Sequence, residues 1–343
     1  MTTAIASRAF ELADPDAVFD FYYRQGWTDG LPIVPPTEDK ILAMLAALRR
    51  GPDEIIAVVA PRMAPATAEK VAINMVMAGC LPAYAPVVAA GVAAVCAPTF
   101  NLHGIQTTTN PVAPLLLVNG PIRSGVELNC GRNALGPGRR SNAAIGRAMR
   151  FILQNIGGGT PGEVDKSTLG MPGKYTFCFG EDEENSPWTP LHVDRGFAVE
   201  DSVATVIGAQ GTHNICHLGP HGRGALDLVA DAMATKGNNN VFIGAGNPLV
   251  VLPSGHAQRL AAEGFSKHDV QAYLWEHSGM PEASYDAAEI APMFTPCVHA
   301  GMVRVTRRPE DILVVVAGGP EPYHITYLPS FGETEAISCR IDV

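Results

Sequence analysis

Two kinds of apolar pattern alternate along this chain. Continuous apolar runs rich in β-branched residues predict buried strands, and apolar residues at helical spacing beside capping residues predict helices. The predicted strands are residues 54–60, 112–119, 175–179, 203–209, 241–252 and 312–317. The predicted helices are residues 14–25, 38–49, 67–78, 84–97, 141–156, 224–235, 254–264 and 266–277. This alternation favours an α/β fold with mixed or parallel sheets covered by helices.

The second part of the pattern resembles the first. An Asn-Pro pair precedes an apolar run at residues 110–118 (NPVAPLLLV) and again at residues 246–253 (GNPLVVLP). We therefore expect two pseudo-related α/β halves, residues 51–200 and 201–343, after an N-terminal helical arm, residues 1–50, with a Pro-rich connection. A cleft between two such halves is a common location for a small-molecule site.

Composition narrows the function classes. The 343 residues are 47% hydrophobic and 17% charged, which is typical of a globular core. The formal net charge of −10 disfavours nucleic-acid binding. Seven cysteines at wide spacing do not resemble a disulfide framework, and no secretory signal or bilayer-spanning run is evident. We expect a soluble cytoplasmic homo-oligomer with reduced thiols and no contact with membranes.

The strongest chemical signal is the segment of residues 211–223, GTHNICHLGPHGR. Its glycines and proline predict a bent loop rather than a helix. One interpretation is a divalent metal site, zinc or iron, with His213, His217 and His221 as ligands. Another is a Cys216 nucleophile with His213 or His217 as its base. The spacing matches no recognised metal motif, so a third interpretation, a turn held by its own hydrogen bonds, stays open.

A second candidate segment is the acid-rich end of a predicted strand, EDEEN at residues 181–185. Open α/β sheets place their sites at strand ends, and neighbouring acids raise one another's pKa values. Glu184 and His192 are the predicted acid–base residues, and Asn185 is a predicted substrate contact. The alternative is a solvated acidic turn.

A third candidate segment, CGRNALGPGRRSN at residues 130–142, leads into a predicted helix. Glycines, arginines and a polar cap at a helix N-terminus are typical of an anion site. Arg139, Arg140 and Asn142, with Lys174, are therefore predicted to hold an anionic group of the substrate. The alternative is a Gly-Pro turn with solvated arginines. Walker A and GxGxxG motifs are absent, so no nucleotide cofactor is expected.

Three longer motifs carry a family resemblance. They are WTDGLPIVPPT at residues 27–37, GPGRRSNAAIGRAMR at 136–150 and PGKYTFCFGEDEENSPWTPLHVDRGF at 172–197. Through them most of the chain resembles a bacterial family, some members of which are associated with short UGSC proteins that contain cysteine or selenocysteine. The resemblance implies thiol or selenol chemistry and a small Cys/Sec-containing partner protein. It assigns no catalytic residues, and the chain contains no UGSC string.

These features favour an enzyme that acts on a small polar or anionic molecule in a cleft between the halves, of the lyase/hydratase or hydrolase type. One alternative is a thiol-redox partner of a small Cys/Sec protein, using Cys216, Cys178 or Cys130. Another is a non-catalytic module that binds a ligand or a cation. The C-terminal segment adds His324 and Cys339, of which the lone cysteine is more often incidental.

The enzyme interpretation requires three separate segments of the chain to form one site. The His/Cys segment has no self-contained motif, so it must form one wall of a shared site. Residues 130–142 and 181–185 are the predicted other walls. The three segments must therefore converge in space.

Overall fold

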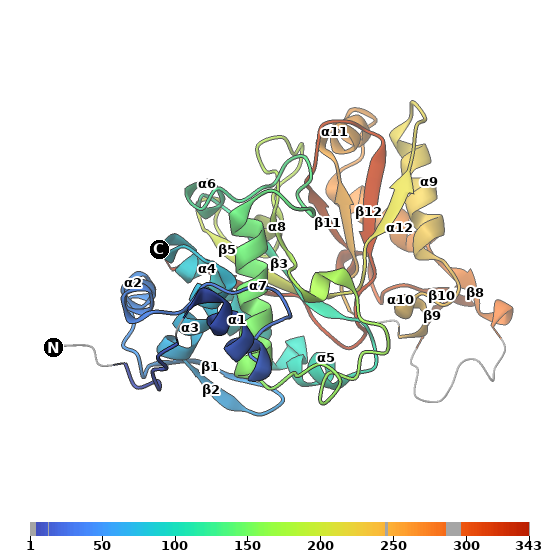
Figure 1. Cartoon of the computed structure of the whole chain (residues 1–343). Helices are drawn as coiled ribbons and strands as arrows, with labels where there is room; N and C mark the ends of the chain where they lie inside the picture. Colours follow the sequence, from blue (N-terminus) through green and yellow to red (C-terminus); the bar gives the residue numbers. More distant parts are fainter. Residues whose placement is uncertain (1–4, 13, 244–245, 286–295, 343) are drawn as a thin grey trace.

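Two four-stranded mixed sheets pack face to face, and helices cover the outer face of each (Figure 1). The computed structural model describes residues 5–12, 14–243, 246–285 and 296–342. The result is a four-layer α/β fold, which confirms the predicted fold class of mixed sheets with helical cover.

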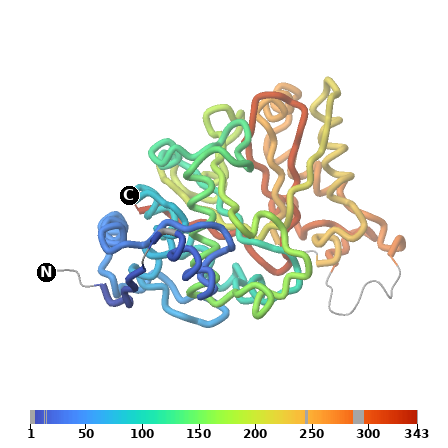
Figure 2. Tube along the Cα trace, viewed as in Figure 1, coloured from blue at the N-terminus to red at the C-terminus, as the bar shows by residue number. Residues whose placement is uncertain are grey.

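The first sheet has the strand order β13-β5-β3-β4. The central strand β3 (Ala113–Asn119) is parallel to β4 (Cys178–Gly180) and antiparallel to β5 (Val203–Ala209). At the far edge, β13 (Ile337–Arg340) is antiparallel to β5. The last strand of the chain therefore returns to the N-terminal half, as Figure 2 also shows.

The second sheet has the strand order β11-β7-β12-β6. Strand β7 (Leu249–Leu252) is parallel to β11 (Leu313–Val316) and antiparallel to β12 (His324–Leu328). At the far edge, β6 (His213–Cys216) is antiparallel to β12.

The two sheets repeat one pattern of strand directions. In each, a central strand has a parallel neighbour on one side, an antiparallel neighbour on the other, and a further antiparallel strand at the edge. The edge strand β13 follows β12 of the other sheet along the chain, and the edge strand β6 directly follows β5 of the first sheet. The boundary predicted at residue 200 does not separate the sheets, because β5 and β13 complete the first one. A relationship between the halves stays a prediction.

Helices fill the outer layers. The N-terminal part contains α1 (Pro15–Arg24), α2 (Glu38–Leu48), α3 (Ala68–Ala78), α4 (Ala85–Val95), α5 (Leu102–Thr107), α6 (Ile122–Gly125) and α7 (Arg140–Asn155). The C-terminal part contains α8 (Leu191–Asp194), α9 (Gly222–Met233), α10 (Asn239–Phe242), α11 (Ser254–Ala262) and α12 (Lys267–His277). Helices α3, α4 and α7 share the first sheet's outer core, and α9, α11 and α12 share that of the second.

Short elements complete the chain. A hairpin pairs β1 (Ile55–Val59) with β2 (Ala64–Thr67), and a small sheet contains β8 (Met280–Pro281), β9 (Cys297–His299) and β10 (Met302–Arg304). Single 3₁₀ turns are η1 (Pro82–Tyr84), η2 (Pro98–Phe100), η3 (Pro172–Lys174), η4 (Glu282–Ser284) and η5 (Pro309–Asp311).

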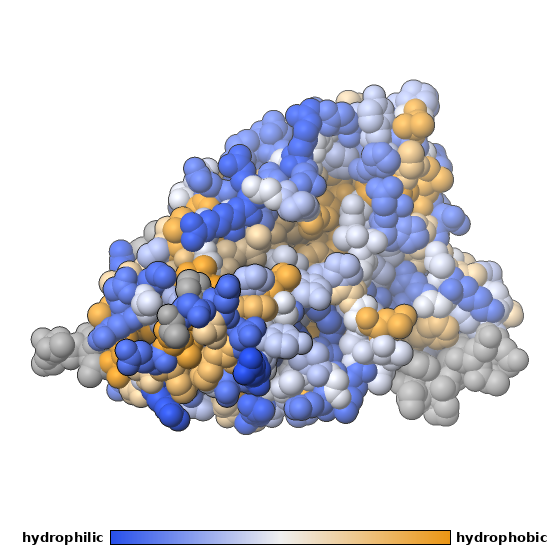
Figure 3. Space-filling view, viewed as in Figure 1, coloured by the Kyte–Doolittle hydropathy of each residue, from blue (hydrophilic) through white to orange (hydrophobic). Residues whose placement is uncertain are grey.

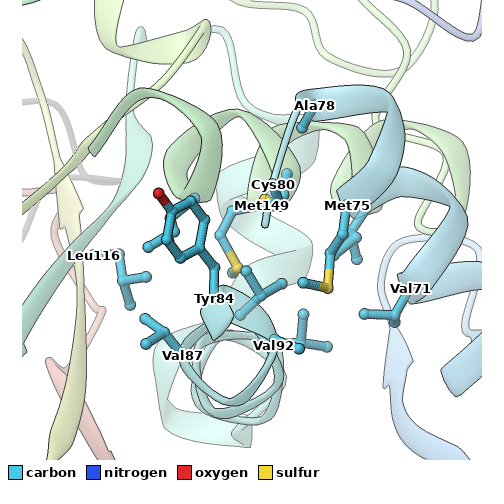
Figure 4. Close-up of a cluster of buried hydrophobic side chains, with 14 of the residues drawn as sticks. Val71, Met75, Ala78, Cys80, Tyr84, Val87, Val92, Leu116 and Met149 are labelled. Carbon is cyan, nitrogen blue, oxygen red and sulfur yellow. The ribbon is translucent and has the colours of Figure 1, made fainter. Parts of the chain in front are cut away.

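Burial on both faces explains the continuous apolar strands. In β3, Leu115 and Leu117 point into the core between the sheets, whereas Leu116 points outward to the helices. Figure 4 shows Leu116 beside Val87 of α4 and Met149 of α7. Because successive side chains of a strand point to opposite faces, a strand between two apolar layers needs apolar residues at every position.

Local signals placed several helix ends correctly. The Thr67 hydroxyl caps α3 by accepting a hydrogen bond from the Lys70 amide, and Ser266 with Asp269 forms the predicted capping box of α12. The predicted bent loop at residues 213–216 was wrong, because these residues form β6. The strand predicted at residues 241–252 begins only at Leu249; residues 244–245 of that range lie outside the described residues.

No single helix of the described chain has the length and apolar character needed to cross a bilayer. One pair, residues 82–95 and 98–107, meets that test together, with a 75° bend between its members.

The core between the sheets gives a first prediction. Leu117 is fully buried there. Changing Leu117 to Ala should lower the free energy of unfolding by about 2–5 kcal/mol, because it leaves a cavity between two packed sheets. Urea denaturation measures the change. Leu169→Ala is the control, since that side chain is 96% exposed and its truncation should have little effect.

Candidate functional site

The strand β6 divides the predicted His/Cys segment between two faces of the second sheet. Ile215 packs into the outer core, so its neighbours Asn214 and Cys216 point to the inner face. On the adjacent strand β12, His324 is the direct cross-strand partner of Cys216. Side chains in such a pair have Cβ atoms about 4.5–5.5 Å apart. The fold therefore places a thiol and an imidazole side by side.

Asn214 completes this group. It precedes Cys216 by two residues on the same face, and its Nδ2 lies 3.3 Å from Nδ1 of His324. This contact holds the imidazole by one nitrogen and leaves Nε2 for other partners. Cys216, His324 and Asn214 are all exposed, at the open end of the inner face.

A cavity of about 430 Å³ adjoins this group. Its walls come from the loop before α7, the ends of β7 and β11, and β12, with His324 among them. The lining residues are Asn133, Ala134, Leu135, Gly136, Val251, Pro253, Ala317, Gly318, Gly319, Glu321, His324 and Thr326. Figure 3 shows a hollow with an apolar floor on this side of the molecule, between the loop after α6 and β12. Apolar walls with a few polar groups are typical of a small-molecule site.

One of the other two predicted walls lines this cavity, and no residue of the His/Cys segment 211–223 does. Residues 133–136 of the glycine–arginine segment line the cavity. Asn142 shapes this wall, because its side chain accepts a hydrogen bond from the Asn129 amide (2.8 Å) and donates to the carbonyls of Asn129 (3.0 Å) and Ala134 (3.2 Å). Asn142 is buried, so it supports the loop instead of meeting a ligand.

The predicted anion-binding cations lie elsewhere. Arg140 donates through Nε to the Gly79 carbonyl (2.9 Å) at the end of α3. Lys174 pairs with the buried carboxylate of Asp165 (2.7 Å), which also binds Arg150 (3.4 Å). Arg139 is exposed where α7 begins and is not part of the cavity wall. None of the three predicted cations reaches the cavity.

The acid-rich segment surrounds a buried arginine. Arg123 binds Glu183 (2.9 Å) and Glu184 (2.9 Å) and donates to the carbonyl of Glu181 (2.6 Å). The hydrogen bond from Arg123 lowers the pKa of Glu184, whereas burial raises the pKa of Glu181. Glu184 is therefore held as a carboxylate in an ion pair and is not free for the acid–base role predicted for it.

His192 and Asn185 lie in the same acid-rich region and make structural contacts there. His192 is fully buried, with Nε2 3.4 Å from the Val199 carbonyl and Nδ1 3.9 Å from Glu183. The amide of Asn185 donates to Asp182 (2.9 Å). The main-chain amide of Asp182 in turn donates to the Val316 carbonyl at the end of β11 (2.7 Å). This segment joins the two sheets behind the cavity and does not line it.

The three histidines predicted as metal ligands are not gathered. His213 and His217 are four residues apart in nearly extended chain, about 13 Å between Cα atoms. His221 is exposed and lies 3.8 Å from Glu263. Within the described part of the chain, no three His, Cys, Asp or Glu side chains are arranged to hold a metal ion.

His217 instead packs against His256 of α11, with ring centroids 5.4 Å apart. His256 is fully buried, and neither of its ring nitrogens has a hydrogen-bond partner among the described residues. Burial, and to a lesser degree the nearby Arg259, lowers the pKa of both histidines; with the added effect of the neighbouring His217, the pKa of His256 falls to about 4. The pair is therefore neutral at pH 7.

The cysteines differ in access. All seven lie in the described residues, and Cys216 is the one that is exposed. Burial raises the pKa values of Cys130 and Cys178, and that of Cys80 to about 12. Cys216 is thus the thiol best placed to meet a molecule in solution.

The sequence pointed to Cys216 with His213 or His217 as its base, whereas the imidazole opposite Cys216 on the neighbouring strand is that of His324. His324 is 108 positions away along the chain and comes into place through strand pairing. Asn214 lay inside the highlighted segment without being singled out. Ile215 was the available signal, because a strand that buries it places residues 214 and 216 on the face opposite His213 and His217.

No protein-family model matches this chain, and no curated protein matches it. The bacterial family resemblance, the zinc or iron, the Cys/Sec-containing partner protein and the homo-oligomer therefore stay predictions.

The buried arginine gives a second prediction. Replacing Arg123 with Met should lower the free energy of unfolding by about 3–5 kcal/mol, because it leaves the largely buried carboxylate of Glu183 without its cation. Urea denaturation at pH 7 measures this. Arg308→Met, which removes an exposed pair with Asp311, should cost less than about 1 kcal/mol. Equal effects of the two changes would contradict this account of the cluster.

The histidine pair gives a third prediction, on pH. The pKa of His256 is about 4 in the folded chain and about 6.5 in the unfolded chain. The unfolded chain therefore binds the proton first as the pH falls, so stability is complete above about pH 6.5 and declines toward pH 4. His256 alone should remove about 2 kcal/mol between pH 7 and pH 5.

His256→Gln should remove that part of the pH dependence, whatever it does to stability at pH 7. His268→Gln is the matched control, because His268 is an exposed histidine on the neighbouring helix α12. Denaturant unfolding of the three proteins at pH 5, 6 and 7 decides the matter. A His256→Gln protein with the wild-type pH dependence would contradict the assignment.

Proposed function

We propose that this protein is a cysteine-dependent hydrolase that cleaves an acyl bond of a small molecule bound in the cavity between the sheets. One observation carries the proposal: Cys216 and His324 are cross-strand partners, His324 contacts Asn214, and His324 also lines the cavity. A thiol, an imidazole and a group that orients the imidazole are the parts of an activated nucleophile.

The first half of the reaction forms a thioester. His324 Nε2 takes the thiol proton as the Cys216 sulfur attacks the acyl carbon of the substrate. The carbon–sulfur bond forms, the bond to the leaving group breaks, and the leaving group departs with its electron pair and the proton from His324. Cys216 then carries the acyl group.

The second half restores the thiol. His324 takes a proton from a water molecule that attacks the thioester carbon. The carbon–sulfur bond breaks, the acid product leaves, and the proton on His324 returns to the sulfur. Water is the only co-reactant, so the cycle needs no oxidant or reductant.

Asn214 is a positioning residue in this proposal. An imidazolium carries hydrogen on both nitrogens, so Nδ1 then needs an acceptor. A half-turn of the Asn214 amide brings its oxygen to the position that Nδ2 occupies beside His324.

Iodoacetamide alkylation tests the nucleophile. Cys216 should react at least about tenfold faster at pH 7 in the wild type than in His324→Asn, because the imidazole then no longer removes the thiol proton. Peptide mass spectrometry gives the rate at Cys216 and, in the same sample, at the partly exposed Cys339, which should be unchanged.

His213→Asn serves as the matched control, because it changes a histidine on the other face of β6. It should leave the Cys216 rate within about twofold of wild type. Asn214→Ala should slow alkylation less than His324→Asn does, since it disturbs only the orientation of the ring. A Cys216 rate that does not depend on His324 would refute the proposal.

A further inference from the structure

One ion pair spans the rim of the cavity. Arg132, from the loop before α7, binds Glu321, from the loop between β11 and β12. Both side chains are exposed. Gly319 lies beneath the pair, because a Cβ at that position would come within 2.9 Å of Arg132 Cγ. Glu321 and Gly319 both line the cavity, so this arginine lies at its entrance.

The same loop leads directly to the nucleophile. The Tyr323 amide donates to the Glu321 carbonyl (3.0 Å), and the His217 amide donates to the Tyr323 carbonyl (2.9 Å). The next residue, His324, faces Cys216. A ligand held at the entrance by Arg132 can therefore extend along the cavity to His324, the strand partner of Cys216.

Arg132 is the charged group that suits a ligand here. Apart from His324, the described residues that line the cavity include no side chain able to carry positive charge. An ion pair between exposed side chains contributes little to stability, so a ligand can replace one partner at small cost. The guanidinium is planar and binds any carboxylate through two parallel hydrogen bonds. A ligand carboxylate can therefore take the place of the Glu321 carboxylate.

We propose that the substrate of this site carries a carboxylate, which displaces Glu321 from Arg132 while the acyl carbon faces Cys216. This proposal rests on the proposed function, because it uses the same thiol. It assigns Arg132 as the specificity-determining residue and Glu321 as the group that holds Arg132 in place while the cavity is empty.

Two alkylating reagents separate the charge of the ligand from the reactivity of the thiol. Iodoacetate and iodoacetamide react with Cys216 in the same way: the carbon–sulfur bond forms, the carbon–iodine bond breaks, and iodide leaves with the electron pair. The thiol proton passes to His324. The reagents differ in one group, a carboxylate in place of an amide, so the ratio of their rates at Cys216 reports on Arg132.

Arg132→Gln should slow alkylation of Cys216 by iodoacetate at least about fivefold and leave the iodoacetamide rate within about twofold. Glu321→Gln should speed iodoacetate, because the competing carboxylate is gone. Arg308→Gln is the matched control: it removes an exposed, ion-paired arginine at the opposite end of β11 and should change neither rate.

Three results would overturn the inference. The first is a ratio of iodoacetate to iodoacetamide rates that is the same in wild type and in Arg132→Gln. The second is a loss of the Arg132 effect at high salt, which would indicate long-range attraction only. The third is a preference for the cationic reagent 2-bromoethylamine that Glu321→Gln removes. Failure of the proposed function is separate, because it would appear as an iodoacetamide rate that does not depend on His324. If the iodoacetamide rate at Cys216 depends on His324 but the ratio of iodoacetate to iodoacetamide rates does not depend on Arg132, only the carboxylate assignment fails.

Discussion

The packing of the two sheets against each other determines where a site can form. Leu115 and Leu117 of β3 meet Leu249 and Val251 of β7 in one apolar core, which fixes the inner faces of both sheets. Toward one end of β12 this core gives way to polar residues, Thr326 and then His324, and there the cavity begins. The candidate site is therefore the point at which the contact between the sheets ends.

The first sheet has the same arrangement of strand pairs around a threonine. Thr205 pairs with Leu117 and Ser338 there, as Thr326 pairs with Val251 and Asn214 in the second sheet. Arg195 covers that position by donating to the Ser338 hydroxyl (2.7 Å) and to the Ala336 carbonyl. Two residues further along the same strand pair, Arg340 and Val203 stand where Cys216 and His324 pair in the second sheet, so the first sheet has neither a thiol nor an imidazole there.

Local chemistry was readable from the sequence, whereas strand pairing was not. Thr67 and Ser266 correctly predicted where their helices begin, because a capping side chain bonds to backbone amides only a few residues away. The buried strands followed from apolar runs such as residues 203–209. The pairing of Cys216 with His324 depends on register between strands 108 residues apart, which no local pattern encodes. Glu184 was predicted to be catalytic and Lys174 to bind an anionic group, because the sequence does not show their buried partners, Arg123 and Asp165.

The central claim is that Cys216 becomes acylated with His324 as its base. The most direct measurement mixes the protein with a small activated ester, such as a nitrophenyl ester, stops the reaction within one turnover and locates the acyl group by peptide mass spectrometry. The account predicts one acyl group, on Cys216, that hydrolyses in wild type and fails to form at a comparable rate in His324→Asn. An acyl group on another residue, or equal acylation of Cys216 in both proteins, would contradict it.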